Sequence, residues 1–210
     1  MDRGPRLEIR RLTRRHVGPL DLSLAPGECV TLSGPSGAGK TLLLRALADL
    51  DPRQGRVLLD GVSSRDTEPH LWRRRVGMLP AESAWWKDTV REHFKHPDKA
   101  ETERLGLPPE VMGWTVSRLS TGERQRLALL RLLEIGPRAL LLDEPTANLD
   151  PAGTLRVERL LSDYMARHGA CCLWITHDPA QVSRVSRRHL ILWGGTLREA
   201  PGPEHAEGPS

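Results

Sequence analysis

The feature that most constrains this chain of 210 residues is a glycine-rich segment at residues 34–41, with the sequence GPSGAGKT. It matches the pattern G-x-x-x-x-G-K-[ST], whose glycines let the backbone bend until successive N–H groups point at phosphate oxygens. A strand-like apolar run at residues 29–32 precedes the segment, and a helix-like run at residues 41–47 follows it. A strand, a loop and a helix N-terminus in this order make an anion site, so the sequence predicts nucleotide binding.

The side chains at the end of this loop predict how the phosphates are held. The Lys40 ammonium can reach the β- and γ-phosphates, and the Thr41 hydroxyl can ligate Mg²⁺. The residues predicted to surround the phosphates are Gly34, Pro35, Ser36, Gly37, Ala38, Gly39, Lys40 and Thr41.

A second strong signal lies at residues 140–144, where three leucines are followed by Asp143 and Glu144. Such an apolar run is typical of a parallel strand buried on both faces, and open α/β sheets bind ligands at the carboxyl ends of these strands. We therefore predict that Asp143 holds Mg²⁺ through water and that Glu144 is the general base for the attacking water. Taken alone, the pair would be equally compatible with a strand end that carries two solvated acids.

Residues 119–123, with the sequence LSTGE, precede a run of leucines at helical spacing. A serine and a threonine are good N-cap residues, and the glutamate is placed to complete a capping box. The N–H groups and the dipole of the same helix end can also bind a phosphate. The two interpretations are compatible, and the candidate nucleotide-binding residues here are Ser120, Thr121, Gly122 and Glu123.

The charge pattern restricts the partners. The formal net charge is only +4, although six arginines gather near the N-terminus. These are Arg3, Arg6, Arg10, Arg11, Arg14 and Arg15. We interpret them as a solvated basic face, with a face near anionic lipid headgroups as the alternative. Nucleic acid is not an expected partner.

The cysteines and the hydropathy indicate a compartment. The three cysteines show neither metal-ligand spacing nor a disulfide framework, which fits a reducing cytosol. The adjacent Cys171 and Cys172 should lie on opposite faces of a strand. Apolar runs are only a few residues long, far below the roughly 20 needed to span a bilayer, and no secretory signal is evident. We expect a soluble, cytoplasmic chain.

The order of segments predicts the α/β class, with a P-loop NTPase core built on a parallel sheet. An N-terminal antiparallel β subdomain and a small helical subdomain, at about residues 84–135, are expected to join this core. Residues 1–199 should form one domain, and the tail at residues 200–210, rich in Pro, Gly and Glu, should be disordered. Strands are expected at residues 57–61, 76–79, 139–142, 171–175 and 190–193, and helices at residues 127–133 and 152–168.

In this order the motifs resemble those of the nucleotide-binding domain of ABC transporters. Residues 34–41 resemble its Walker A loop, and residues 119–123, followed by residues 124–126 (RQR), resemble its signature motif. Residues 140–144, together with Pro145 and Thr146, resemble its Walker B segment. Residues 147–150 (ANLD) resemble its D-loop, and residues 174–178 (WITHD) its switch-histidine segment. The signature motif separates this family from other P-loop proteins, so the resemblance is specific.

The resemblance implies the ATPase subunit of an ABC transporter, with ATP and Mg²⁺ as cofactors. It implies a head-to-tail homodimer in which one subunit's Walker A loop faces the other's signature motif across ATP. Lys40, Glu144 and His177 would be the catalytic residues, with His177 at the γ-phosphate, and Asp150 would couple the two sites. The implied partner is a separate transmembrane permease, with this chain peripheral on the inner face of the cell membrane. The alternative is a soluble or regulatory ABC ATPase that acts on another kind of partner.

Three features depart from the family pattern. Thr121 stands where the family usually has glycine. Ala81 stands where the family has a glutamine that touches Mg²⁺ and the lytic water, and the next residue, Glu82, is the candidate metal ligand in its place. Residues 10–20 contain no aromatic ring to stack on adenine, and His16 is the nearest candidate.

Trp85 and Trp86 follow the altered loop. They are either core tryptophans or anchors in a surface groove, since large aromatic side chains are good interface anchors. Their position in the sequence resembles that of the groove in which the family grips its transmembrane subunit.

Overall fold

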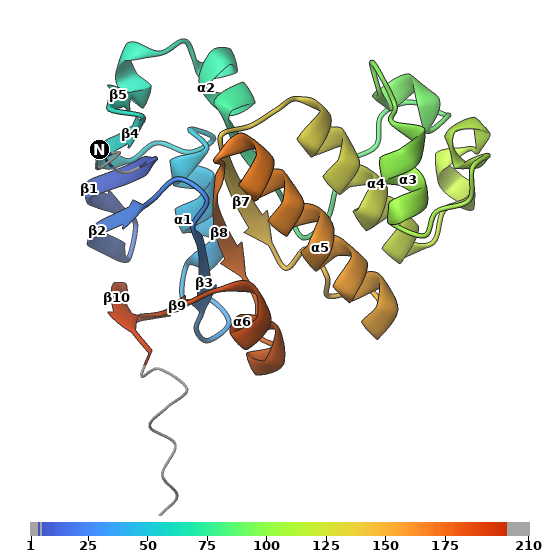
Figure 1. Cartoon of the computed structure of the whole chain (residues 1–210). Helices are drawn as coiled ribbons and strands as arrows, with labels where there is room; N and C mark the ends of the chain where they lie inside the picture. Colours follow the sequence, from blue (N-terminus) through green and yellow to red (C-terminus); the bar gives the residue numbers. More distant parts are fainter. Residues whose placement is uncertain (1–3, 5, 201–210) are drawn as a thin grey trace, which may run out of the picture.

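A computed structural model describes residue 4 and residues 6–200 of the chain (Figure 1). The strands are β1 (Leu7–Arg14), β2 (Val17–Leu24), β3 (Cys29–Ser33), β4 (Gln54–Leu59), β5 (Val62–Ser63), β6 (Val76–Leu79), β7 (Ala139–Asp143), β8 (Cys171–Ile175), β9 (Arg188–Trp193) and β10 (Thr196–Glu199). The α-helices are α1 (Lys40–Leu47), α2 (Pro69–Arg75), α3 (Lys99–Arg104), α4 (Thr121–Glu134), α5 (Pro151–His168) and α6 (Pro179–Val185). Short 3₁₀ helices cover Ser64–Asp66, Arg91–His93, Val111–Gly113 and Val116–Arg118.

The strands form two sheets. The N-terminal sheet is antiparallel, with the order β2-β1-β4-β5. The second sheet has the order β10-β9-β3-β8-β7-β6, in which β9 to β6 run parallel and β10 pairs antiparallel at the edge. The predicted fold class is confirmed. The edge strand β10 was not predicted, because Thr196–Glu199 contains a single apolar residue and is mostly exposed.

The parallel sheet is buried on both faces. Every residue of β7 and β8 is buried, which fits their continuous apolar sequences. One face packs with α1 and the antiparallel sheet, and the other packs with α4 and α5. Cys171 belongs to the first core and Cys172 to the second, so the prediction that they face opposite ways is confirmed.

The helices that flank the sheet begin at capped residues. Helix α4 starts with the predicted capping box, in which Ser120 and Glu123 each bond the other's backbone N–H. Helix α5 starts with Asp150 as N-cap and Pro151 at the first helical position, and it ends at Gly169 in the left-handed conformation (φ 58°).

The N-terminal arginines do not all lie on a solvated face. Arg6 is only 7% exposed. Its guanidinium pairs with Asp60 and donates to the carbonyl of Gly169, so it joins the antiparallel sheet to the end of α5. The interpretation of a basic surface is therefore wrong for Arg6, while Arg10 and Arg11 are exposed. Arg3 lies outside the described residues.

The predicted disordered tail falls almost entirely outside the described residues, which end at Ala200. The N–H of Ala200 itself donates to the carbonyl of His189 at 2.9 Å. Within the part of the chain that the structure describes, no helix combines the length and the apolar character needed to cross a membrane.

Candidate functional site

The predicted site residues converge because three neighbouring parallel strands end at the same edge. β3 leads into residues 34–41, β7 ends at Asp143, and β8 ends two residues before His177. The registers place Leu32 and Asp143 each opposite Ile175, so the three strand ends are level. Ligands of open α/β sheets bind at such carboxyl ends.

Two glycines of the loop are required by space as well as by conformation. Gly34 has φ 141°, and a Cβ there would lie 2.3 Å from the carbonyl oxygen of Leu192. Gly39 has φ 100°, and its Cβ would lie 2.3 Å from a methyl carbon of Val17. Both contacts are shorter than real side chains allow, so the loop keeps this path only with glycine at these positions.

The N-terminus of α1 is suited to binding an anion. Gly39 is its N-cap, no side chain caps it, and its first turn holds no acidic residue. The Lys40 ammonium lies within the loop and donates to the carbonyls of Gly34 (2.7 Å) and Pro35 (3.0 Å). Free N–H groups, a helix dipole and a lysine together fit a phosphate group. The loop residues Pro35, Ser36 and Gly37 are exposed beside them.

Thr41 and Asp143 meet at the base of the loop. The Thr41 hydroxyl donates to Oδ2 of Asp143 at 2.7 Å, across 102 positions of sequence. Asp143 is only 6% exposed, and a buried carboxylate favours a nearby cation. A hydroxyl beside a carboxylate at the phosphate end of the loop is an oxygen donor set that fits Mg²⁺.

Glu144 and His177 form the second pair at this edge. Nε2 of His177 lies 3.4 Å from Oε1 of Glu144, and both side chains are partly open to solvent. The Glu144 N–H donates to the carbonyl of Ile175 at 3.1 Å, which fixes the residue against the end of β8. Glu144 has φ 48°, a conformation that non-glycine residues seldom adopt and that is enriched at functional sites.

The signature segment lies against the D-loop of the same chain. A Cβ at Gly122 would lie 3.0 Å from the carbonyl oxygen of Asn148 and 3.1 Å from the Leu149 side chain. Asp150 caps α5 by accepting from the Gly153 N–H at 2.8 Å. Thr121, the departure from the family pattern, is exposed at the start of α4.

Within the described residues, no hydrogen bond or ion pair joins residues 120–123 to residues 34–41. Walker A, Walker B and His177 therefore meet in one chain, while the signature motif stands apart from them.

His16 and Glu82 are the candidate replacements for the family's adenine-stacking ring and its glutamine. The two residues differ in their placement. The His16 ring lies close to the loop, since a Cβ built on Gly39 would lie 3.2 Å from its Nε2. Ala81 and Glu82 are both exposed, and Glu82 makes no hydrogen bond or ion pair with any residue described. The roles of His16 at the base and of Glu82 at the metal stay predictions.

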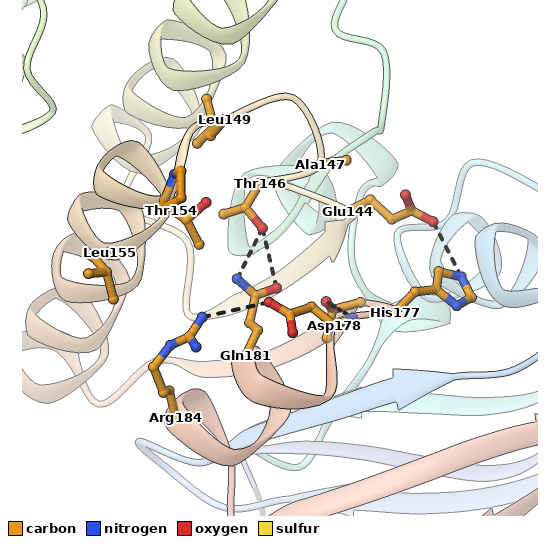
Figure 2. Close-up of a pocket in the computed structure, with 12 residues that line it drawn as sticks. Glu144, Thr146, Ala147, Leu149, Thr154, Leu155, His177, Asp178, Gln181 and Arg184 are labelled. Atoms are coloured by element: carbon orange, nitrogen blue, oxygen red, sulfur yellow. Dashed lines mark hydrogen bonds and ion pairs between the residues drawn. The ribbon is translucent and has the colours of Figure 1, made fainter.

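A cavity of about 530 Å³ opens beside Glu144 and His177 and continues between α5 and α6 (Figure 2). Besides Glu144 and His177, its polar lining includes Thr146, Thr176 and Asp178 from the motif segments. It also includes Thr154, Gln181 and Arg184, which no sequence motif contains. Gln181 and Glu158 are buried there, with 1% and 8% exposure. Glu158 falls on the apolar face of α5, and an acid on such a face was the one local signal that could have indicated them.

Trp85 and Trp86 form an aromatic surface around His93. Both indole rings meet the imidazole edge-on, with centroids 4.8 and 4.9 Å away. The Arg131 guanidinium lies 4.7 Å from each indole centroid, and burial lowers its pKa from the ordinary value. Trp86 is 66% exposed, whereas Trp85 is half-buried and packs on the core beneath α4. Of the two sequence interpretations, the structure supports a surface anchor for Trp86.

Comparison with known proteins identifies the family of this chain. Residues 17–147 match the sequence profile of the family described as ABC transporter. The chain is 31% identical to the probable iron export ATP-binding protein FetA of Escherichia coli K12, over 80% of each chain. It is 36% identical to the aliphatic sulfonates import ATP-binding protein SsuB 1 of Pseudomonas fluorescens, over 97% of this chain and 81% of that protein.

Two further relatives are longer than this chain. Protein STAR1 of rice is 34% identical over 95% of the chain, which spans 64% of its length. A bacterial Atm1-family ABC exporter, solved with ATP bound, superposes on 95% of the chain with a TM-score of 0.81 at 24% identity, and the chain spans 39% of it. The structural likeness to this exporter supports the fold of the chain.

The fold and the site define a P-loop nucleotide-binding protein in which Thr41 of the loop meets Asp143, with Glu144 and His177 side by side at the same sheet edge. The chain belongs to the ABC transporter family. The family predicted from the order of motifs is thereby confirmed.

Proposed function

We propose that this chain is the ATP-binding and ATP-hydrolysing subunit of an ABC transporter, and that it powers translocation through a separate transmembrane permease. The observation that carries the proposal is the hydrogen bond between Thr41 and Asp143, with Glu144 and His177 paired directly beside it. These contacts bring together residues from the Walker A, Walker B and switch-histidine segments, which are far apart in the sequence. The names of the relatives, as import and export ATP-binding proteins, support the same function.

The chain's residues have distinct tasks in this proposal. The loop N–H groups and Lys40 hold the phosphates, and their charges neutralise the charge that develops during phosphoryl transfer. Mg²⁺, when bound by Thr41 and Asp143, would add to that neutralisation. Glu144 accepts the proton of the attacking water, and His177 orients the γ-phosphate. Positioning and charge, rather than covalent chemistry, supply most of the catalysis.

The proposed active form is a head-to-tail homodimer. Residues 120–123 stand apart from the loop of their own chain, and their capped helix end is available to a second copy. We propose that Asp150 couples the two sites. It caps α5 at the end of the segment on which Gly122 packs, which supports this role.

The proposed membrane contact is the surface around Trp86. A tryptophan that is 66% exposed above Arg131 and His93 is a suitable anchor for a partner. We propose accordingly that the chain is peripheral at the inner face of the membrane. We also propose that residues 1–199 form one ABC ATPase domain with a helical subdomain at about residues 84–135.

The test combines hydrolysis and association. The purified chain should hydrolyse ATP with Mg²⁺, and Lys40→Ala should abolish this activity. The tagged chain should co-purify from detergent-solubilised membranes with a permease that mass spectrometry identifies, and Trp86→Ala should weaken that association. Recovery with a soluble partner in place of a permease would favour the alternative of a non-transport ABC ATPase.

A further inference from the structure

We propose that Gln181 is a positioning residue that holds the switch histidine and the D-loop in one arrangement, and that Glu158 and Arg184 orient its amide. This inference rests on the proposed ATPase function. It assigns a task to Gln181, Glu158 and Arg184, which none of the sequence motifs includes.

The amide of Gln181 bridges two segments of the chain (Figure 2). Its Nε2 donates to the Thr146 hydroxyl at 3.0 Å, and that hydroxyl donates back to Oε1 at 3.2 Å. The same Nε2 donates to Oε1 of Glu158 at 2.9 Å. A 1% exposed amide that uses both of its ends in this way is held in a single place.

Glu158 and Arg184 decide which way the amide points. Arg184 donates to both oxygens of Glu158, with Nε at 2.9 Å and Nη2 at 2.8 Å. In this two-point pairing both carboxylate oxygens of Glu158 act as acceptors, and Oε1 accepts from Gln181 as well. The NH₂ group of Gln181 must therefore face Glu158, which leaves its oxygen for Thr146.

The two bridged segments both carry catalytic residues. Thr146 follows Glu144 by two positions and precedes the D-loop, residues 147–150. Gln181 lies four positions after His177, on α6, which Asp178 caps by accepting from the Ala180 N–H at 2.9 Å. Because the turn between His177 and Gln181 is fixed by this cap, a shift of Gln181 would move His177 relative to Glu144.

In this inference the bridge maintains the 3.4 Å separation between Nε2 of His177 and Oε1 of Glu144. Catalysis by positioned groups is sensitive to displacements of about 1 Å. Loss of the bridge should consequently lower kcat by about tenfold or more while the KM for ATP changes little, since the phosphate loop is not part of the bridge.

The experiment removes the bridge from each side in the full-length chain. Gln181→Met keeps the length of the side chain without its hydrogen bonds, and Thr146→Val keeps the shape without the hydroxyl. Thr146→Ser keeps the hydroxyl and should restore kcat toward the wild-type value. Ser183→Ala is the matched control, because Ser183 lies on α6 but is exposed and outside the cluster.

We expect Gln181→Met and Thr146→Val each to lower kcat by about tenfold, and the double variant to be no slower than either, since both remove the same bridge. A purely structural role would lower the melting temperature and leave kcat of the folded protein unchanged. Wild-type kcat in Gln181→Met or in Thr146→Val overturns the inference, as does a double variant with multiplied losses. Thr146→Val serves as the test if Gln181→Met does not fold.

Hydrogen exchange provides a readout that is independent of activity. Gln181→Met should speed exchange of the amides at residues 147–150, which lie on the other side of the bridge, whereas Ser183→Ala should not. A wild-type chain that hydrolyses no ATP would refute the proposed function. The exchange result would still test whether Gln181 restrains residues 147–150. Unchanged exchange at residues 147–150 in Gln181→Met overturns the inference.

Discussion

The imidazole Nε2 of His177 lies 3.4 Å from the carboxylate Oε1 of Glu144, at the ends of two adjacent parallel strands. The two residues are far apart in sequence and come together because β7 and β8 are paired in register up to Asp143 and Ile175. In the proposed function Glu144 is the base and His177 orients the γ-phosphate, and at this separation the two can act on the same water and phosphate. Catalysis should therefore depend on each of them, and on the strands that hold them level.

Glu144→Gln should keep ATP binding and slow hydrolysis by roughly 10²–10⁴-fold, because the amide cannot accept the proton of the attacking water. It should also accumulate an ATP-bound dimer, visible by size-exclusion chromatography. Glu103→Gln, at an exposed acid whose partner among the described residues is Lys99, is the matched control. Turnover at the wild-type rate in Glu144→Gln would remove the residue from its role as base.

The composite site predicts complementation between two inactive chains. Lys40→Ala and Ser120→Arg should each be inactive alone, because both sites of each homodimer are damaged. In a mixture, some heterodimers pair an intact Lys40 with an intact Ser120, so part of the activity should return. The specific activity of the wild-type chain should rise with protein concentration as dimers form. A rate per monomer that is independent of concentration would contradict the head-to-tail dimer.

Two substitutions in the altered loop test how the chain functions without the family's glutamine. Glu82→Ala removes the candidate replacement, and Ala81→Gln restores the glutamine. Glu82 is exposed beside the position where the family has its glutamine. If Glu82 replaces that glutamine, Glu82→Ala should lower hydrolysis by about tenfold or more, since a charged ligand near the phosphates is lost.

If Glu82→Ala leaves both basal and partner-stimulated hydrolysis intact, Glu82 has no role at the metal. Ala81→Gln would then restore the missing water ligand. It should raise basal turnover and weaken stimulation by the membrane partner, which would identify the missing glutamine as a regulatory feature.

The nucleotide base should be held loosely. Among the described residues, two of the three atoms nearest to a Cβ built on Gly39 belong to the imidazole of His16, and none belongs to an indole or phenol ring. ATP and GTP should accordingly bind within about tenfold of each other, or ~1.4 kcal/mol. Competition of each nucleotide with a fluorescent analogue measures this ratio. A much stronger preference for ATP that His16→Ala abolishes would show that His16 reads the base.

Stability should fall in mild acid through His189. Its ring lies beside the Thr31 hydroxyl (Nδ1, 2.9 Å) and the Ser33 hydroxyl (Nε2, 3.0 Å), and burial lowers its pKa from the ordinary value of 6.5. Above that value both the folded and the unfolded chain carry a neutral ring. Below it the unfolded chain binds a proton that the folded chain resists, so the free energy of unfolding decreases as the pH falls.

His189→Gln should remove this part of the pH dependence. The decrease in melting temperature between about pH 7.5 and about pH 5.5, which bracket the ordinary histidine pKa, should be smaller in the variant than in the wild type. His70→Gln, at an exposed histidine, should leave the decrease unchanged. An identical decrease in His189→Gln and the wild type would refute the assignment to His189.

The sequence by itself determined the features that depend on residues close together in the chain. The loop at residues 34–41, the apolar run that ends at Asp143 and the capping box of Ser120 each follow from spacing within a few positions, where geometry is fixed locally. Their order was specific enough to predict the family, the fold class and a nucleotide site before any tertiary contact was known.

Only the tertiary structure decided which polar residues are buried together. Gln181 and Glu158 are 23 positions apart, and no local pattern indicates that they share a hydrogen bond. Arg6 belongs to a cluster of arginines in the sequence, yet it is buried because Asp60 and the carbonyl of Gly169 reach it from distant segments. A buried polar group is stable only with partners, and the partners are set by how strands and helices pack rather than by their sequence neighbours.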